Sequence, residues 1–210
     1  MGVSKQQAAE NRRAIIAAAE TLFRERGVDG VGLAELMKAA GFTQGGFYNH
    51  FKSKDDLVRA VLDEAMHAGA DALETAVAQS AAMGANPLTR QIDWYLSEGH
   101  RADLDAGCPL SGFVGDVRRL DDGARQTFTA GLDWNLKRFT ELVRTPQMTD
   151  EAARQTAVAL FSEMVGALLL ARAVVQTDPV LSDEILARGR AHLHATVRAW
   201  SRRRHAESHR

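Results

Sequence analysis

Side chains able to bind phosphates and base edges gather in one short stretch of the sequence, between positions 43 and 54. Tyr48 offers a hydroxyl group for a phosphate, and Gln44 offers an amide that can pair with adenine. Lys54 brings positive charge close to a predicted helix N-terminus, which itself favours phosphate. This chemistry is recognition, because the sequence offers no nucleophile–base pair, metal-ligand set or phosphate-cradling loop beside it. We therefore expect no enzyme activity, no catalytic residue, no cofactor and no metal site.

Two short helices must hold these side chains in place. Apolar spacing predicts a helix over 33–40, which stops at Gly41, and a second helix over 44–51, for which Thr43 is a plausible N-cap. Gly41 can take the left-handed backbone conformation that a sharp turn between them needs. A further helix is predicted over 12–26. Together these patterns indicate a helix-turn-helix.

The second helix of the pair has an unusual composition. Phe47 and Phe51 are four residues apart and should face the core, which turns Tyr48 outward. Gly45 and Gly46 follow one another, and in a helix each costs roughly 1 kcal/mol relative to alanine. That cost is reasonable where the backbone must come close to something bulky, such as the wall of a DNA major groove.

The run GFTQGGFYNHFKSK, residues 41–54, resembles the DNA-binding signature of the TetR/AcrR transcriptional regulators. That signature reads Gly-(Val/Phe)-(Ser/Thr)-x-Gly-x-(Leu/Phe)-Tyr-x-(His/Tyr)-Phe-x-(Ser/Thr)-Lys. The resemblance covers roughly residues 11–62, and the rest of the chain is similar to the family only in length and helical pattern. It implies a set of residues at the DNA: Thr43, Gln44, Gly45, Gly46, Tyr48, Asn49, His50 and Lys54.

Within this set the resemblance implies different roles. Thr43, Tyr48 and Lys54 would contact phosphates, and Gln44 would contact bases. Asn49 and His50 leave two alternatives open, contact with bases or packing inside the protein. One position outside the set departs from the family: Gly32 stands before the helix over 33–40, where Ser or Thr is common, so a side-chain phosphate contact is lost there.

The fold class that we predict is all-α, with about nine helices in total. A three-helix helix-turn-helix domain is expected over residues 1–52, followed by a larger helical ligand-sensing and dimerisation domain over 53–210. Apolar periodicity, interrupted by Gly, Pro and Asp-rich breaks, places the later helices. Their expected ranges are 53–79, 88–104, 109–119, 122–144, 150–176 and 182–203.

Composition agrees with an ordinary globular protein of the cytoplasm. The chain is 45% hydrophobic and 25% charged, and its single cysteine excludes an intrachain disulfide, as in a reducing compartment. The polar first residues do not form a secretory signal. The apolar stretch 157–175 carries Glu163 and Arg172, which favours a buried helix over a membrane span. Residues 1–60 hold nine Lys or Arg against seven acids, only a mild positive excess for a nucleic-acid-binding protein.

The resemblance assigns the last two helices, near 150–176 and 182–203, to a homodimer interface. Leu160, Met164 and Leu168 are expected to fill its seam. The alternative is that these apolar stripes only complete a monomeric core. A dimer would place two recognition helices about 34–36 Å apart on a palindromic operator.

A pocket for a small-molecule effector is expected among the helices between 53 and 144. The candidate lining residues are apolar or aromatic: Met66, Trp94, Tyr95, Cys108, Phe113, Phe128, Trp134 and Phe139. The alternative for each aromatic residue is an ordinary place in the core.

Cys108 stands before Pro109, at a predicted helix N-terminus where a thiol can become reactive. Some regulators of this type that respond to electrophiles carry a similarly placed Gly-Cys pair, and the alternative is a small buried side chain. His192 and His194 are two residues apart, so they point to different sides of a helix and do not predict a metal site.

From these features we predict a sequence-specific, ligand-released repressor that binds its operator as a homodimer. The alternative is a helical scaffold or partner-binding protein without DNA binding. Such a scaffold would explain the composition but not the signature over 41–54.

Overall fold

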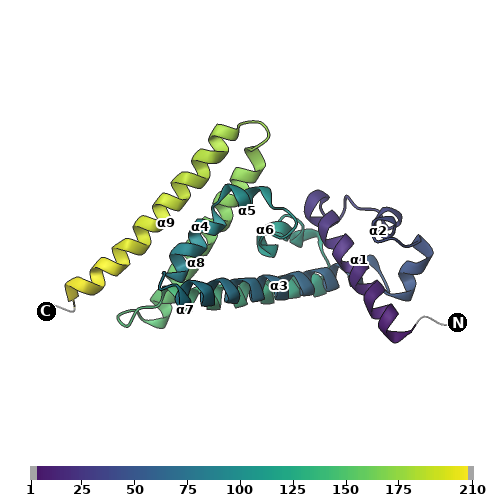
Figure 1. Ribbon diagram of the computed structural model, residues 1–210, viewed down its shortest axis with the longest axis horizontal. Coiled ribbons are helices and arrows are strands. Elements are labelled where there is room, and N and C mark those ends of the chain that lie inside the picture. Colours follow the sequence, from purple (N-terminus) through teal and green to yellow (C-terminus); the bar gives the residue numbers. More distant parts are fainter. Residues whose placement is uncertain (1–3, 208–210) are drawn as a thin grey trace. The chain divides into compact units, whose positions relative to one another are not determined.

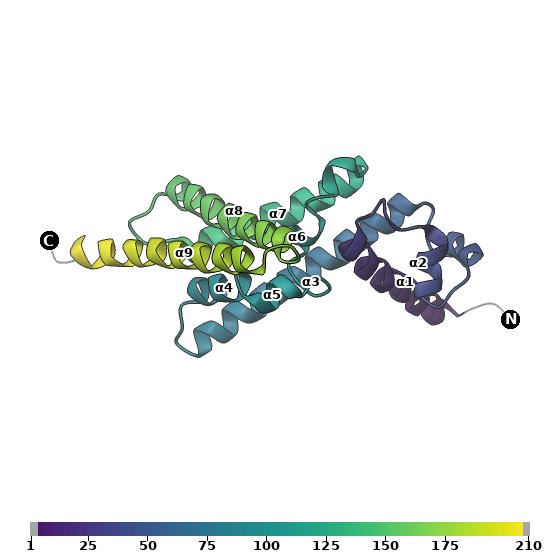
Figure 2. The ribbon, with the colours of Figure 1, turned by 90° about the horizontal axis from the view of Figure 1, so that it is seen from above.

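The computed structural model describes residues 4–207, and every regular element in that part of the chain is helical (Figures 1 and 2). The predicted all-α fold is therefore confirmed. The elements, in chain order, are α1 (Lys5–Arg26), α2 (Leu33–Ala39), the 3-10 helix η1 (Gln44–Asn49), α3 (Lys54–Ala82), α4 (Pro87–Tyr95), α5 (Glu98–Ala102), α6 (Pro109–Phe113), the 3-10 helix η2 (Val117–Arg119), α7 (Asp122–Val143), α8 (Asp150–Val174) and α9 (Pro179–Glu207).

Two of the predicted helices are each divided in two. The helix expected over 88–104 ends at Tyr95, and the Ser97 hydroxyl then accepts a hydrogen bond of 3.0 Å from the His100 amide as the N-cap of α5. The helix expected over 109–119 ends at Phe113 and continues after Gly115 as η2. The N-cap at Ser97 is therefore a helix-start signal that apolar spacing alone did not detect.

The chain packs as two compact units. The N-terminal unit contains the residues up to 69 together with 104–132, and the C-terminal unit contains 70–103 together with the residues from 133 onward. Helices α3 and α7 each contribute residues to both units. The predicted boundary at residue 52 separates a DNA-binding domain from a ligand-sensing domain, and it differs from the division between the two packing units. It stays a prediction.

The N-terminal unit is built on α1. Its first turn is capped by the Ser4 hydroxyl, which accepts from the Gln7 amide at 3.1 Å, and its last turn ends at Gly27. The apolar face of α1 packs on the helices that follow it. Its fully buried core includes Ile15, Ala19, Phe23, Leu36, Met37, Phe47 and Phe51.

The C-terminal unit is built on α8 and α9, which pack along one another as a helical hairpin (Figure 1). Leu160, Met164 and Leu168 are buried within this protomer. They were expected in a seam between two chains, and their true place is the hairpin's own core. Arg172 of α8 fastens α5 to the hairpin, because its guanidinium donates to the carbonyl oxygens of His100 at 2.6 Å and Asp103 at 3.0 Å.

Candidate nucleic-acid interface

The turn between α2 and η1 has the geometry that the sequence predicts. Gly41 has φ +82°, a left-handed conformation that favours glycine. The Phe42 amide donates to the Met37 carbonyl at 2.8 Å, and the Gly41 amide donates to the Lys38 carbonyl at 3.1 Å. This pair of bonds is a Schellman motif, which satisfies the last carbonyls of α2 and redirects the chain into η1.

Phe47 and Phe51 fix the orientation of η1. Both side chains are buried, and their rings stack with centroids 5.5 Å apart. Tyr48 lies on the opposite side and is 70% exposed, the most exposed aromatic side chain among the large hydrophobic residues that the structure describes. The prediction of the inward and outward faces is confirmed, although η1 is a 3-10 helix and ends two residues before 51.

The residues that the resemblance places at the DNA form an exposed group around Tyr48. Thr43, Gln44, Gly45 and Asn49 are exposed, whereas Gly46, His50 and Lys54 are half-buried. The His50 ring lies 6.4 Å from the ring of Phe42. Contact between these residues and DNA stays a prediction, and their accessibility agrees with it.

Neither glycine of η1 is required by the packing or the backbone of the protein itself. Neither residue has a positive φ. A Cβ atom added at Gly45 would meet no atom within 4 Å, and one added at Gly46 would meet only ordinary contacts with Met37 and Thr43, at 3.9 and 4.0 Å. The protein therefore has room for a side chain at both positions, and its own packing does not require glycine there.

Lys54 is placed differently from the expectation for a phosphate ligand. Its ammonium group donates to the carbonyl oxygens of Val28 at 2.6 Å and Val31 at 2.7 Å, in the turn between α1 and α2. It also lies 5.8 Å from the centre of the buried Phe23 ring. Two of its three N–H donors are therefore used inside the protein.

One contact at the end of η1 could not be predicted from spacing. Arg12 of α1 donates from Nη1 to the His50 carbonyl oxygen at 2.8 Å, and its guanidinium carbon lies 4.1 Å from the centre of the Phe51 ring. His50 is the C-cap residue of η1. The two residues are 38 positions apart, and the sequence signals only that Arg12 lies on the first helix.

An ion-pair cluster borders the turn between α1 and α2. Arg119 donates to Asp29 at 2.9 Å and to Asp116 at 2.6 Å. The hydrogen bond to Asp29, and then the one to Asp116, raises the pKa of the Arg119 guanidinium above its ordinary value. Asp116 is buried, and a Cβ atom at Gly27 would lie 3.2 Å from its carboxylate, so the cluster closes tightly on the end of α1.

Comparison with known proteins places this geometry in a family. The family model described as "Bacterial regulatory proteins, tetR family" matches residues 15–61, which hold most of α1, all of α2 and η1, and the start of α3. Residues 15–61 therefore match the DNA-binding segment of the TetR/AcrR family. The HTH-type transcriptional regulator TtgR of Pseudomonas putida is 47% identical over 60 residues, and the aligned segment is 29% of this chain and 29% of that protein.

Solved structures of the TetR type share the fold across most of the chain. The reduced form of E. coli NemR aligns with a TM-score of 0.72 and 23% identity, covering 88% of this chain and 95% of that one. A TetR regulator from Chloroflexus aurantiacus aligns with a TM-score of 0.72 and 23% identity, covering 91% and 96%. At this identity the alignments demonstrate a common fold and nothing finer.

The residues predicted to line an effector pocket do not all belong to one packing unit. Met66, Cys108, Phe113 and Phe128 lie in the N-terminal unit. Trp94, Tyr95, Trp134 and Phe139 lie in the C-terminal unit. Most are buried, whereas Trp94 and Trp134 are 47% and 36% exposed. Their role in ligand binding stays a prediction.

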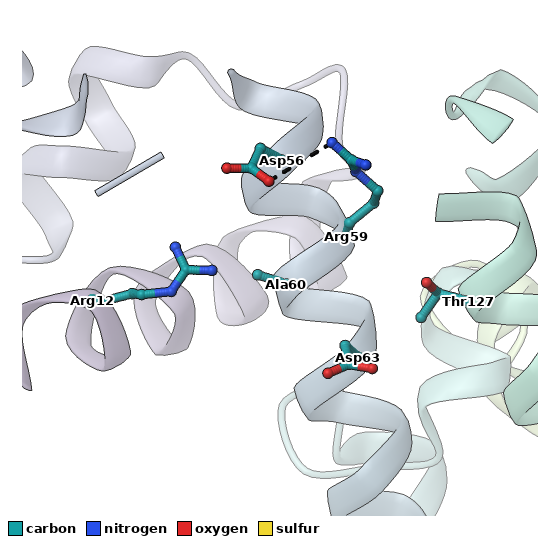
Figure 3. A pocket seen from close by; sticks show the side chains of 6 residues that line it. All are labelled: Arg12, Asp56, Arg59, Ala60, Asp63 and Thr127. Carbon is teal, nitrogen blue, oxygen red and sulfur yellow. Dashed lines mark ion pairs between the residues drawn. The ribbon is translucent and has the colours of Figure 1, made fainter. Parts of the chain in front are cut away.

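A recess of about 270 Å³ opens in the N-terminal unit, but it does not fit that description (Figure 3). It contains none of the predicted ligand residues, and its open, polar lining differs from the apolar enclosure of a typical small-molecule site. The lining residues come from α1, α3 and α7: Arg12, Asp56, Arg59, Ala60, Asp63 and Thr127. We therefore do not assign the effector to it.

His192 and His194 of α9 each lie beside a carboxylate. His192 lies 2.8 Å from Glu163, and His194 lies 2.7 Å from Asp93. No group of three or more metal-ligating side chains occurs among the described residues. Cys108 is half-buried and is the N-cap residue of α6, directly before Pro109.

Proposed function

We propose that the protein is a transcriptional repressor of the bacterial cytoplasm, which binds a palindromic operator as a homodimer. Release follows when a small molecule or an electrophile engages the part of the chain beyond the helix-turn-helix. Repression is supported by relatives that match the N-terminal segment. One of them is the HTH-type transcriptional repressor BepR of Brucella suis. The relatives TtgR and BepR align over less than a third of their own length, so function beyond the DNA-binding segment is a proposal.

The surface of η1 is the observation that carries this proposal. Tyr48 is 70% exposed beside Gln44 and Asn49, which offer a phenolic hydroxyl and two amides to a ligand. Gly45 and Gly46 lie between them and keep the backbone accessible without any internal need for glycine. Hydrogen-bonding side chains around a bare stretch of backbone suit a close approach to phosphates and base edges in a major groove.

The homodimer is supported by an apolar face that the protomer leaves uncovered. Val158, Ser162, Gly166 and Leu170 are spaced by four on α8, and Leu170 is 60% exposed. A Cβ atom at Gly166 would meet nothing within 4 Å. By length and composition alone, the helix α8 is long and apolar enough to cross a membrane. Only 33% of its most apolar 18-residue stretch is buried within the chain. Because the chain also carries a DNA-binding segment, a second copy of the chain would cover this face.

The neighbouring helix offers a matching surface. Ala187, Ala191 and Ala195 of α9 are exposed and also spaced by four. Small side chains let the backbones of two helices approach closely. Together the two faces would build a four-helix interface from two copies of α8 and α9, and so hold two η1 elements about one DNA turn apart.

Effector release needs only a difference in affinity between two conformers. A ligand among the predicted lining residues would stabilise a conformer in which the two recognition elements are wrongly spaced, at a typical coupling of about 1–3 kcal/mol. Cys108 supports an electrophile as one such effector, because it is partly accessible and stands at a helix start. The structurally similar NemR was solved in a form described as reduced.

Selection of bound fragments from a random duplex library, with purified full-length protein, tests the proposal. We expect enrichment of a palindrome whose half-sites are about one helical turn apart. Thiol-reactive reagents should then release the protein from that palindrome, and Cys108→Ser should abolish this response. Absence of any enriched sequence, also at low salt, would favour the scaffold alternative.

A further inference from the structure

Two basic side chains of the DNA-binding segment point into the protein. Lys54 Nζ lies 2.6 Å from the Val28 carbonyl oxygen and 2.7 Å from that of Val31. Both valines are buried, at 5% and 1% exposure, so the turn that they form has little freedom to leave its ammonium partner. This turn leads directly into α2, and Lys54 is the first residue of α3. One side chain therefore joins the entrance of the helix-turn-helix to the helix that follows it.

Arg12 makes the corresponding contact at the other end. It holds the His50 carbonyl at 2.8 Å, which is where η1 ends, and its guanidinium covers the ring of Phe51 at 4.1 Å. Phe51 is itself buried and stacked on Phe47. Both cations thus combine a backbone carbonyl with an aromatic ring, and both bind carbonyls outside any continuous helix.

We propose that Arg12 and Lys54 are positioning residues, which hold the two ends of the helix-turn-helix and do not neutralise phosphates. This inference rests on the proposed DNA-binding function. An irregular backbone segment has few internal hydrogen bonds, so an external donor at each end restricts its movement. Holding 28–31 and 50 in place fixes η1 between them, and with it the exposed side chains of Gln44, Tyr48 and Asn49.

Salt dependence separates a positioning cation from a phosphate-binding one. Each phosphate neutralised by a protein cation contributes about 0.9 to the slope of log affinity against log salt concentration. A variant that loses a phosphate contact has a shallower slope, whereas one that loses only its geometry binds more weakly with the slope unchanged.

The experiment uses full-length protein and the palindrome that it selects, with affinity measured by fluorescence anisotropy over a salt series. We compare Lys54→Met and Arg12→Met with Lys52→Met, which removes an exposed charge two residues from Lys54 and so controls for charge alone. We expect Lys54→Met and Arg12→Met to weaken binding roughly 5- to 150-fold, the range typical of coupling between sites. Their slopes should equal that of the wild type.

A shallower slope, by about 0.9 for each lost contact, would overturn the proposal and restore the phosphate role. Unchanged affinity with an unchanged slope would overturn it too, since neither role would then operate. If the wild-type protein selects no palindrome, the proposed function itself has failed, and that result is obtained before any variant is made.

A measurement on the wild-type protein keeps the inference testable if a variant does not fold. The ammonium signal of Lys54 in a nitrogen-15 NMR spectrum should already be protected from solvent exchange in the free protein. Its chemical shift should stay constant when operator DNA is added. A signal that appears or moves only with DNA would mark Lys54 as a phosphate ligand and contradict the positioning role.

Discussion

Arg24 of α1 donates a hydrogen bond of 3.1 Å to the carbonyl oxygen of Gly107, the residue before Cys108. Its guanidinium also lies 5.1 Å from the centre of the Phe113 ring in α6 and pairs with Glu20 at 2.7 Å. The Arg24 side chain is only 4% exposed. One buried arginine therefore fastens α6 and the segment before it to the first helix of the DNA-binding segment.

Replacing this arginine should destabilise the protein more than replacing its neighbour. Arg24→Met removes charge-assisted hydrogen bonds from a buried site, and we expect the free energy of unfolding to fall by about 1.5–3 kcal/mol. Arg26→Met is the matched control, because Arg26 pairs with Glu35 at 2.8 Å while both side chains are 41–50% exposed. An exposed pair contributes about 0–1 kcal/mol. Urea unfolding measures both, and equal losses would contradict the assigned role of Arg24.

The glycines of η1 should separate stability from DNA binding. We expect Gly45→Ala and Gly46→Ala to leave the fold intact and to stabilise it by up to about 1 kcal/mol each, because the protein has room for the methyl group and alanine favours a helix. Operator affinity should fall in both, since the added atom would meet the DNA. Thermal unfolding and anisotropy provide the two readouts.

Gly41→Ala is the control for these two substitutions. Its φ of +82° strains any residue with a Cβ atom, so this change should destabilise the protein by roughly 1–2 kcal/mol although no atom lies within 4 Å of the added carbon. If Gly45→Ala destabilises the fold as much as Gly41→Ala does, the glycines of η1 have a structural role and the argument from them fails.

The exposed face of α8 should control assembly. Leu170→Glu places a charge on the proposed interface, and we expect the dimer to dissociate, as measured by sedimentation equilibrium. Met83→Glu is the comparison, since Met83 is equally exposed, at 61% against 60%, but lies outside α8 and α9. It should leave the dimer intact. A dimer that survives Leu170→Glu, or a wild-type protein that is monomeric, would rule out this interface.

Sequence reasoning succeeded where a signal is local. The left-handed Gly41, the buried pair Phe47 and Phe51, and the exposed Tyr48 all follow from spacing within one short segment, because a helix turn fixes which side chains share a face. The division of the predicted helices 88–104 and 109–119 into two elements each was missed. At the first break, the capping hydroxyl of Ser97 starts a new helix within a continuous apolar pattern.

The contacts that tie distant segments together could not be predicted. Each contact is a hydrogen bond to a backbone carbonyl oxygen: Arg12 donates to His50, Lys54 to Val31 and Arg24 to Gly107. Every residue has a backbone carbonyl. No residue type marks such an acceptor in advance. The resemblance named Lys54 as a phosphate ligand because its charge is evident in the sequence, whereas the carbonyls that receive it become evident only in the folded chain.

The affinity of Tyr48→Ala for the palindrome that the wild-type protein selects tests directly whether η1 is the DNA-binding surface. Tyr48 is exposed and its ring meets the edge of the Phe47 ring, so we expect the variant to keep its fold and its dimer. Loss of a phosphate or base contact typically costs about 1–3 kcal/mol, which corresponds to a loss of affinity of roughly 5- to 150-fold. Wild-type affinity in a folded Tyr48→Ala dimer would contradict the assignment of η1 as the DNA-binding surface.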